Sequence, residues 1–123
     1  MQMPTMAVDD QADVRLLLKV LIDRANDGLF VVGEAATGSE AVAVAEQTGP
    51  LVIVLDEMMP GMSGLETVEH LRRRDPQQII ILCSAYLDDD LVARARQAGV
   101  LHCISKDEVG DLPDLIRSAV ERG

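Results

Sequence analysis

The sequence predicts an α/β fold, with five parallel strands in one doubly wound sheet and five helices packed on it. Two observations support this prediction. Strand-like and helix-like segments alternate five times along the 123 residues, a pattern that favours right-handed crossovers and a parallel sheet covered on both faces. The run 51–55 is wholly apolar, as expected for a strand that is buried on both faces of such a sheet.

The first half of the chain contains two strand–helix units. The first strand ends at Met6-Ala7-Val8, and a helix follows whose apolar residues recur with helical spacing. These residues are Val14, Leu17, Leu18, Leu21 and Ile22. The segment 26–28, Asn-Asp-Gly, ends that helix, and the run 29–32 forms the second strand. Thr37-Gly38-Ser39-Glu40 reads as a capping box that opens a helix through Gln47, and Gly49-Pro50 stops it.

The second half repeats the pattern three times. After strand 51–55, the capping box 63–66 opens a helix that runs to about Arg74. Strand 79–83 follows, then the acidic run 88–90 at the start of a helix, where the dipole favours negative charge. That helix ends at Gly99, and the run 100–104 is the fifth strand. The last helix has an apolar stripe formed by Leu112, Leu115, Ile116, Ala119 and Val120.

Charge and hydropathy exclude several classes of protein. With 11 basic and 21 acidic residues the net charge is −10, so this domain is not expected to bind nucleic acid by itself. No apolar run approaches the roughly 18 residues needed to cross a membrane, and residues 1–5 do not resemble a signal peptide. The sequence leaves open whether residues 1–123 are a complete single-domain protein or the first domain of a longer one.

The two cysteines and the scarcity of aromatic residues describe the predicted interior. Only Phe30 and Tyr86 are aromatic, so the core must be aliphatic. Cys83 and Cys103 both lie in apolar, strand-like runs, which favours two reduced core thiols in a cytoplasmic protein over a disulfide. Their number and spacing do not match a zinc site.

Polar residues stand where four of the predicted strands end. They are Asp9, Asp10, Asp56, Ser84 and Lys106. Because ligands bind outside the carboxyl ends of the strands in an open parallel sheet, we expect three carboxylates, a hydroxyl and an ammonium to converge in one pocket. Crowded carboxylates repel one another, and a hard divalent cation such as Mg²⁺ relieves that repulsion. An aspartate on the most buried strand could act as a nucleophile toward phosphorus.

These residues resemble the receiver domain of two-component response regulators. The resemblance covers essentially the whole chain, taken as one receiver domain over 1–123. It rests on Val8-Asp9-Asp10, the segment 56–64 (Asp-Glu-Met-Met-Pro-Gly-Met-Ser-Gly), Ser84-Ala85 and Lys106. It implies a flavodoxin-like sheet of strand order 2-1-3-4-5 and a signalling module rather than an enzyme, apart from transfer and loss of its own phosphoryl group.

The resemblance also implies a role for each matching position. Asp56 is the expected phospho-acceptor, served by a sensor histidine kinase. Asp10 is expected to ligate Mg²⁺ or Mn²⁺ directly, Asp9 mainly through water, and Met58 through its backbone carbonyl. Ser84 and Lys106 are expected to engage the phosphoryl group, with Lys106 first paired to Asp56, while Ala85 leaves room for that group. A phosphorylation-dependent homodimer is one output that the resemblance allows.

The chain departs from the family pattern at two positions. Lys106 is followed by Asp107, where many receivers have proline; Lys-Asp is typical of receivers that precede LuxR-type helix-turn-helix domains, so a C-terminal DNA-binding domain is a candidate output. Three residues before the lysine, where the family usually has a switching Tyr or Phe, the chain has Cys103. We therefore treat Ser84, Tyr86 and Cys103 as candidate switch residues.

Three other functions are weighed against a phosphorylated receiver. The absent aromatic favours a pseudo-receiver, an interaction module that phosphate does not switch, whereas the intact acidic pocket argues against it. A haloacid-dehalogenase-type phosphatase needs a second Asp where the chain has Met58. A flavodoxin-like FMN binder needs a phosphate loop in place of Asp9-Asp10-Gln11.

The remaining polar and sulfur-containing residues have simple structural interpretations. We predict that His70 and Tyr86 lie at the surface, that His102 lies within a strand and is no phosphohistidine, and that Glu57 is a solvated loop carboxylate. The side chains of Met58 and Met59 are predicted to pack. The basic run 72–74 is predicted to be a solvated helix end.

Overall fold

Five parallel strands form a single sheet in the computed structural model, which describes residues 1–25 and 27–122. Their order is β2-β1-β3-β4-β5, as predicted. The central strand β3 is buried at every position, because neighbours flank it on both edges and helices cover both faces. The strands are β1 (Met3–Val8), β2 (Leu29–Ala35), β3 (Val52–Asp56), β4 (Ile79–Ser84) and β5 (His102–Ser105).

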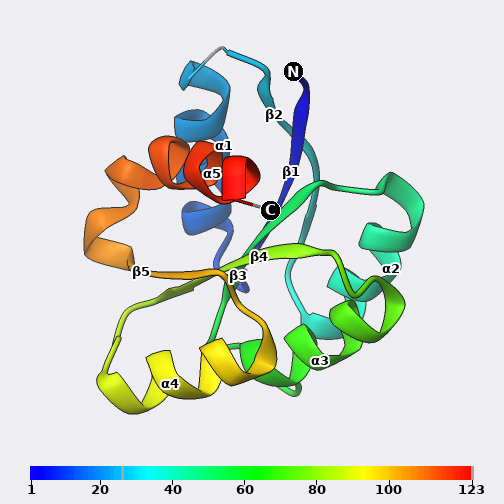
Figure 1. Cartoon of the computed structure of the whole chain (residues 1–123), viewed down its shortest axis with the longest axis vertical. Coiled ribbons are helices and arrows are strands. Elements are labelled where there is room, and N and C mark those ends of the chain that lie inside the picture. Colours follow the sequence, from blue (N-terminus) through cyan, green and yellow to red (C-terminus); the bar gives the residue numbers. More distant parts are fainter. Residues whose placement is uncertain (26, 123) are drawn as a thin grey trace.

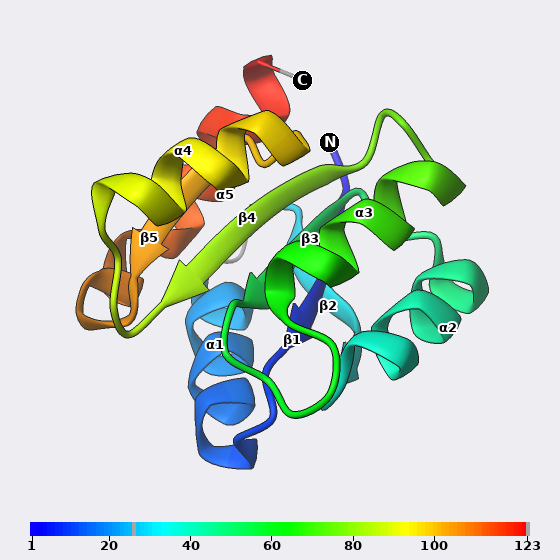
Figure 2. The same ribbon diagram turned by 90° about the horizontal axis from the view of Figure 1, so that it is seen from below.

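Helices cover the sheet on both faces (Figure 1). Helices α1 and α5 lie on one face, and α2, α3 and α4 lie on the other (Figure 2). A short 3-10 helix, η1, joins β5 to α5. The helices are α1 (Ala12–Ala25), α2 (Gly38–Thr48), α3 (Gly64–Arg74), α4 (Asp89–Ala98), η1 (Lys106–Asp111) and α5 (Leu112–Arg122). Within the described ranges, no helix has the length and hydropathy needed to cross a bilayer.

The core has two aliphatic layers, one on each face of the sheet. On the α1/α5 face, Leu18 and Ile22 pack with Ile116 against side chains of the central strands. On the other face, Leu71 of α3 and Leu91 of α4 are part of the second layer. Among the described residues, neither layer includes an aromatic side chain, as the composition predicted. Burial of branched aliphatic side chains at this density is the main stabilising term of such a fold.

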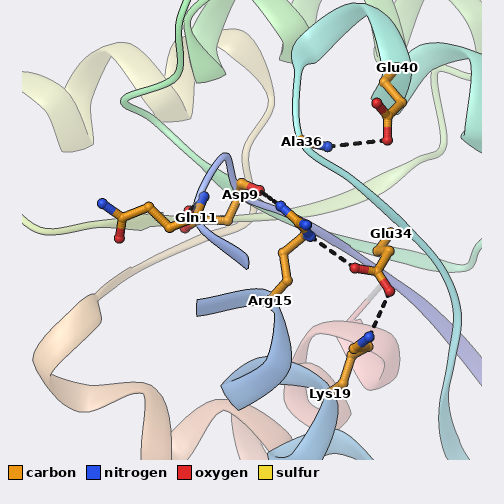
Figure 3. Close-up of polar contacts among 7 residues, drawn as sticks. All are labelled: Asp9, Gln11, Arg15, Lys19, Glu34, Ala36 and Glu40. Atoms are coloured by element: carbon orange, nitrogen blue, oxygen red, sulfur yellow. Dashed lines mark hydrogen bonds and ion pairs between the residues drawn. The ribbon is translucent and has the colours of Figure 1, made fainter. Parts of the chain in front are cut away.

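Glycines and polar caps set the helix ends, largely as predicted. Ser63 and Glu66 form a full capping box at α3, and Asp88 caps α4 by accepting from the Leu91 amide. Gly99 ends α4 in the left-handed conformation, with φ 99°, which glycine adopts without steric cost. The box predicted at α2 is only half formed: Thr37 caps the helix, but the Glu40 carboxylate accepts from the amide of Ala36 (Figure 3).

Three expectations about the elements were wrong. The fifth strand begins at His102 instead of at residue 100, because Val100 turns inward as a buried residue directly after the Gly99 cap. Leu17, assigned to the buried stripe of the first helix, is 47% exposed. Strand β2 continues to Ala35, three residues past its predicted end. Of the segment predicted to end the first helix, Asn26 lies outside the described residues.

The basic run at the end of α3 is more than a solvated helix end. Arg72 donates through Nη1 to the backbone oxygen of Gln78 at 3.0 Å. Arg74 donates through Nη2 to the backbone oxygen of Ala45, in α2, at 2.8 Å. Of the three, Arg73 is exposed, and Arg72 and Arg74 are half-buried. Two of the three arginines therefore tie the end of α3 to neighbouring segments, with Arg74 adding a second donor to the Ala45 oxygen that already accepts from the Gly49 amide.

Candidate functional site

Four strand ends bring the predicted polar residues to one edge of the sheet. Asp9 follows β1, Asp56 ends β3, Ser84 ends β4, and Lys106 follows β5 directly. All four strands are parallel, so their carboxyl ends meet at the same edge. The pairing of Asp56 with Cys83 and of Ser84 with Ser105 fixes their relative height.

Three carboxylates form the acidic part of this site. Asp9, Asp10 and Asp56 each place one carboxylate oxygen within 4.8 Å of the others. Asp9 and Asp56 are buried, whereas Asp10 is exposed. Asp9 is held by the amide of Gln11, which donates to its Oδ1 at 2.9 Å.

Lys106 joins the two buried carboxylates. Its Nζ lies 3.0 Å from Oδ2 of Asp9 and 3.2 Å from Oδ1 of Asp56, so the predicted contact between Lys106 and Asp56 is present. Burial works to lower the pKa of Lys106, but the bond to Asp9 and the charges of both carboxylates outweigh it and the pKa is raised. Lys106 is therefore cationic over the physiological range.

Asp56 is a buried carboxylate at the end of β3. Burial raises its pKa, the charge of Asp9 raises it further, and Lys106 opposes both. Its Oδ1 accepts from the Met58 amide at 3.3 Å. Its Oδ2 is buried and has no hydrogen-bond partner among the described residues. A buried carboxylate oxygen without a partner is costly, so this atom is suited to an added ligand or covalent partner.

The residues fit a hard divalent cation. With all groups ionised, three carboxylates and one ammonium leave two net negative charges at this edge. Oxygen ligands are those that Mg²⁺ prefers, usually one or two carboxylates with water completing the set. The cluster is also open to water on the side of Asp10. Both the charge and the donor type match the predicted metal.

The three switch candidates lie in β4, in the loop that follows it and in β5. The Ser84 hydroxyl is buried and lies 3.2 Å from both the backbone nitrogen and the backbone oxygen of Tyr86. The Tyr86 ring is 79% exposed, as predicted for a surface loop. Cys103 is half-buried and free, and Cys83 is free and buried. Burial raises the pKa of Cys83 to about 12, which keeps that thiol protonated and unreactive.

Two predictions about the loop after Asp56 were wrong. Glu57 is not merely solvated: its Oε1 accepts from the Leu65 amide at 2.9 Å, which helps to cap α3. Met58 does not pack, since 63% of it is exposed, whereas Met59 does pack against the core. The first residue of α3, Gly64, packs directly against the end of β3. A Cβ at that position would lie only 2.5 Å from the backbone oxygen of Asp56, so a larger residue would not fit without a shift.

The sequence did not reveal an ion-pair network that supports the site from α1 (Figure 3). Arg15 donates through Nη1 to the backbone oxygen of Asp9 at 2.8 Å. Its Nε pairs with Glu34 at 2.8 Å, and Lys19 pairs with the other oxygen of Glu34 at 2.7 Å. The network fixes the backbone that carries Asp9. The spacing of Arg15 and Lys19, one helical turn apart, was its only signal in the sequence.

Comparison with known proteins agrees with this geometry. The model of the response regulator receiver domain family matches residues 5–118. The chain belongs to that family. This receiver is 34% identical over 113 residues to the transcriptional regulatory protein LiaR of Bacillus subtilis, covering 91% of the chain and 53% of LiaR. It is 37% identical over 99 residues to the chemotaxis protein CheY of Thermotoga maritima, covering 80% and 81%.

Solved structures place the receiver in a particular branch. A LuxR family two-component response regulator from Aurantimonas superposes with a TM-score of 0.94 at 28% identity, covering 99% of this chain and 87% of that one. The chain is therefore a receiver of the LuxR-type branch, as the Lys106-Asp107 pair indicated. It spans about half the length of LiaR.

Proposed function

We propose that this receiver accepts a phosphoryl group on Asp56 from a sensor histidine kinase and then changes its partner interactions. The observation that carries the proposal is the buried Oδ2 of Asp56. It lacks a partner among the described residues and lies in a cluster with two further carboxylates and Lys106. The family to which the chain belongs is a signalling family, so we expect the protein to catalyse only the transfer and loss of its own phosphoryl group.

The proposed transfer is a displacement at phosphorus. A lone pair on Asp56 Oδ2 forms the new P–O bond, the bond between phosphorus and the kinase imidazole nitrogen breaks, and that electron pair stays on the nitrogen. Lys106 already lies 3.2 Å from the other oxygen of Asp56, so its ammonium is positioned to neutralise charge on the phosphoryl oxygens. Ser84 would exchange its bonds to Tyr86 for a hydrogen bond donated to the phosphoryl group.

We propose Mg²⁺ or Mn²⁺ as the cofactor. Asp10 and Asp56 would hold the ion directly, Asp9 mainly through water, and Met58 through its backbone carbonyl. When bound, the ion would neutralise the crowded carboxylates and charge on the phosphoryl oxygens. The residues of the chain supply the rest: Asp56 is the nucleophile, Lys106 the fixed positive charge, and Arg15 holds the backbone of Asp9.

The wider setting is inferred from the relatives. LiaR is a transcriptional regulatory protein, and we propose that this receiver acts in the cytoplasm and controls a C-terminal DNA-binding domain. Phosphorylation-dependent dimerisation is one route by which it could do so. The net charge of −10 supports a regulatory role, not direct contact with DNA.

Metal-dependent labelling tests the proposed function. With a small phosphodonor such as acetyl phosphate, we expect one phosphoryl group per chain in Mg²⁺ and none in EDTA, measured by intact mass. The reason is that unscreened carboxylates repel the anionic donor. Absence of any adduct in Mg²⁺ would instead favour an interaction module that phosphate does not switch.

We also propose that Tyr86 takes part in the switch in place of the absent aromatic at position 103. A groove of about 440 Å³ lies beside the β4–α4 loop, and Leu87 and Cys103 are among the residues that line it. Tyr86 immediately precedes Leu87, and its exposed ring is free to move when Ser84 releases the loop. The Cys103 side chain is too small to fill and vacate such a space.

Tyrosine fluorescence tests this role of Tyr86. The chain has one tyrosine and no tryptophan, so tyrosine emission reports only on this loop. We expect the emission to change when beryllofluoride and Mg²⁺ are added. Tyr86→Ala should reduce the difference in partner affinity or dimerisation between the two states, and Cys103→Ala is the matched control. An undiminished difference in Tyr86→Ala, together with its loss in Cys103→Ala, would contradict the idea.

A further inference from the structure

The backbone of Asp9 is held at both of its polar groups. Its amide donates to the backbone oxygen of Ala35, in β2, at 3.1 Å. Its carbonyl oxygen accepts from Nη1 of Arg15, in α1, at 2.8 Å. Because a peptide unit is planar, fixing the direction of the Asp9 carbonyl also fixes the position of the Asp10 Cα. Arg15 therefore acts at the point of the chain that carries two of the three clustered carboxylates.

Arg15 is itself anchored to β2, the strand that pairs with β1 (Figure 3). Its Nε pairs with Oε1 of Glu34 at 2.8 Å, and Glu34 directly precedes Ala35 in that strand. These contacts close a ring through Asp9, Arg15, Glu34 and Ala35, which we call the Asp9 clamp. The planar guanidinium holds its donors at fixed angles, so the contact with Glu34 directs Nη1 of Arg15 toward the Asp9 carbonyl.

Glu34 reduces the electrostatic cost of placing an arginine beside a site for a cation. Lys19 and Arg15 both donate to its carboxylate, and these two bonds lower the pKa of Glu34, so it is ionised over the physiological range. Its negative charge offsets part of the positive charge that the two basic residues bring to this side of the acidic cluster. The clamp can therefore hold the backbone of Asp9 without strongly opposing a bound cation.

Asp10 is the member of the cluster that depends most on its backbone. Asp9 and Asp56 are buried, so surrounding atoms restrict their carboxylates, whereas Asp10 is exposed. Its carboxylate nevertheless places an oxygen within 4.8 Å of the other two. An exposed side chain meets two buried ones with a defined geometry only if the Cα that carries it is fixed. The Asp9 clamp supplies that fixed point.

We propose that Arg15 is a positioning residue that sets the affinity of the acidic cluster for a divalent cation. The inference rests on the proposed function, in which this cluster binds Mg²⁺ or Mn²⁺. Groups that orient metal ligands without touching the metal change its affinity by about 10- to 100-fold when they are removed. Electrostatics alone predicts the opposite sign: Arg15 is a cation beside a cation site, so its removal would strengthen binding. The direction of the change therefore separates positioning from a simple charge effect.

Titration with Mn²⁺ at constant ionic strength measures this affinity through the electron paramagnetic resonance signal of the free ion. Arg15→Ala should raise the dissociation constant about tenfold or more. Arg15→Lys keeps the charge but lacks the planar fork, so it should also bind Mn²⁺ more weakly than the wild type does. Lys19→Gln removes a positive charge one turn further along α1 but leaves the Asp9 clamp intact. Its dissociation constant should stay within about twofold of the wild-type value, because salt screens a partly exposed charge.

Urea unfolding in EDTA measures the stability of each variant without metal. A merely structural role would lower that stability in the Arg15 variants and leave the dissociation constant of the folded protein unchanged, which would overturn the proposal. Equal or tighter Mn²⁺ binding in Arg15→Lys would overturn it even if Arg15→Ala did not fold, and so would an equally large loss of affinity in Lys19→Gln.

The same titration distinguishes failure of this inference from failure of the proposed function. Asp10→Asn lacks one carboxylate of the cluster, so its loss of Mn²⁺ binding would show that the titration reports on this site. A wild-type chain that binds no Mn²⁺ would refute the metal site, and the role of Arg15 with it. A wild-type chain that binds Mn²⁺ no better than the Arg15 variants do would refute only the role of Arg15.

Discussion

Replacement of Asp56 with Asn is expected to abolish phosphoryl labelling by acetyl phosphate in Mg²⁺. The amide nitrogen cannot act as the nucleophile, and among the described residues Asp56 is the carboxylate whose buried oxygen lacks a partner. The measurement is intact-mass spectrometry. Glu57→Gln is the matched control, because it neutralises the adjacent carboxylate while keeping an acceptor for the Leu65 amide. That variant should be labelled normally.

Asp56→Asn is also expected to change the stability of the protein. Measuring that change also checks that the variant is folded. Because the pKa of Asp56 is raised in the folded protein, the folded state binds that proton more tightly than the unfolded state. The wild type therefore loses stability as pH rises through the ordinary and then the raised pKa. Asp56→Asn should thus be more stable than wild type at neutral pH, by on the order of 1 kcal/mol. This gain in the free energy of unfolding should shrink in acid, where wild-type Asp56 is protonated. Urea unfolding of both proteins at neutral and at acidic pH measures the difference.

Lys106→Ala separates phosphorylation from the response to it. The variant keeps the nucleophile, so some labelling should persist in intact-mass spectra. It removes the ammonium that contacts both Asp9 and Asp56, so the structural response to beryllofluoride should weaken. A full response in tyrosine emission from this variant would contradict the role given to Lys106.

Added Mg²⁺ is expected to raise the free energy of unfolding of the wild type. An ion that binds only the folded state adds about 1.4 kcal/mol when its concentration is tenfold above the dissociation constant. Thermal unfolding in Mg²⁺ and in EDTA measures the difference. Asp10→Asn should lose most of this gain, because Asp10 is one of the three clustered carboxylates.

Asp13→Asn is the matched control for the metal experiment. Asp13 is also exposed and lies three residues further on, but it is not part of the carboxylate cluster. Its variant should keep the full Mg²⁺ response. Equal melting temperatures of the wild type in Mg²⁺ and in EDTA, together with no heat of Mg²⁺ binding in calorimetry, would contradict the proposal that this cluster binds a metal ion.

The positions of the site residues could be predicted because they follow from topology. Alternation of strands and helices forces a parallel sheet, and a parallel sheet brings its carboxyl ends to one edge. Residues that follow Val8, Leu55 and Cys83 must then meet, whatever their side chains. The contact of Lys106 with Asp56 was predicted from the resemblance, whereas its contact with Asp9 is a side-chain detail that the sequence left undecided.

Features that depend on contacts between distant segments were not predictable. Arg15 and Glu34 are 19 residues apart and meet only because β2 pairs with β1. Helical spacing assigned Leu17 of α1 to the core, but it is 47% exposed. Spacing alone does not determine how much of the surface of α1 the sheet and α5 cover. Val100 lies in an apolar run, yet the Gly99 cap directs it into the core before β5 begins.

Locating the phosphoryl group on the chain tests the central claim most directly. The wild type would be treated with acetyl phosphate and Mg²⁺, the acyl phosphate reduced with borohydride, and the modified residue located by peptide mass spectrometry. A single modification at Asp56, which is lost when EDTA replaces Mg²⁺, is the predicted result. A modification at Asp9, Asp10 or Glu57, or an unmodified chain in Mg²⁺, would contradict it.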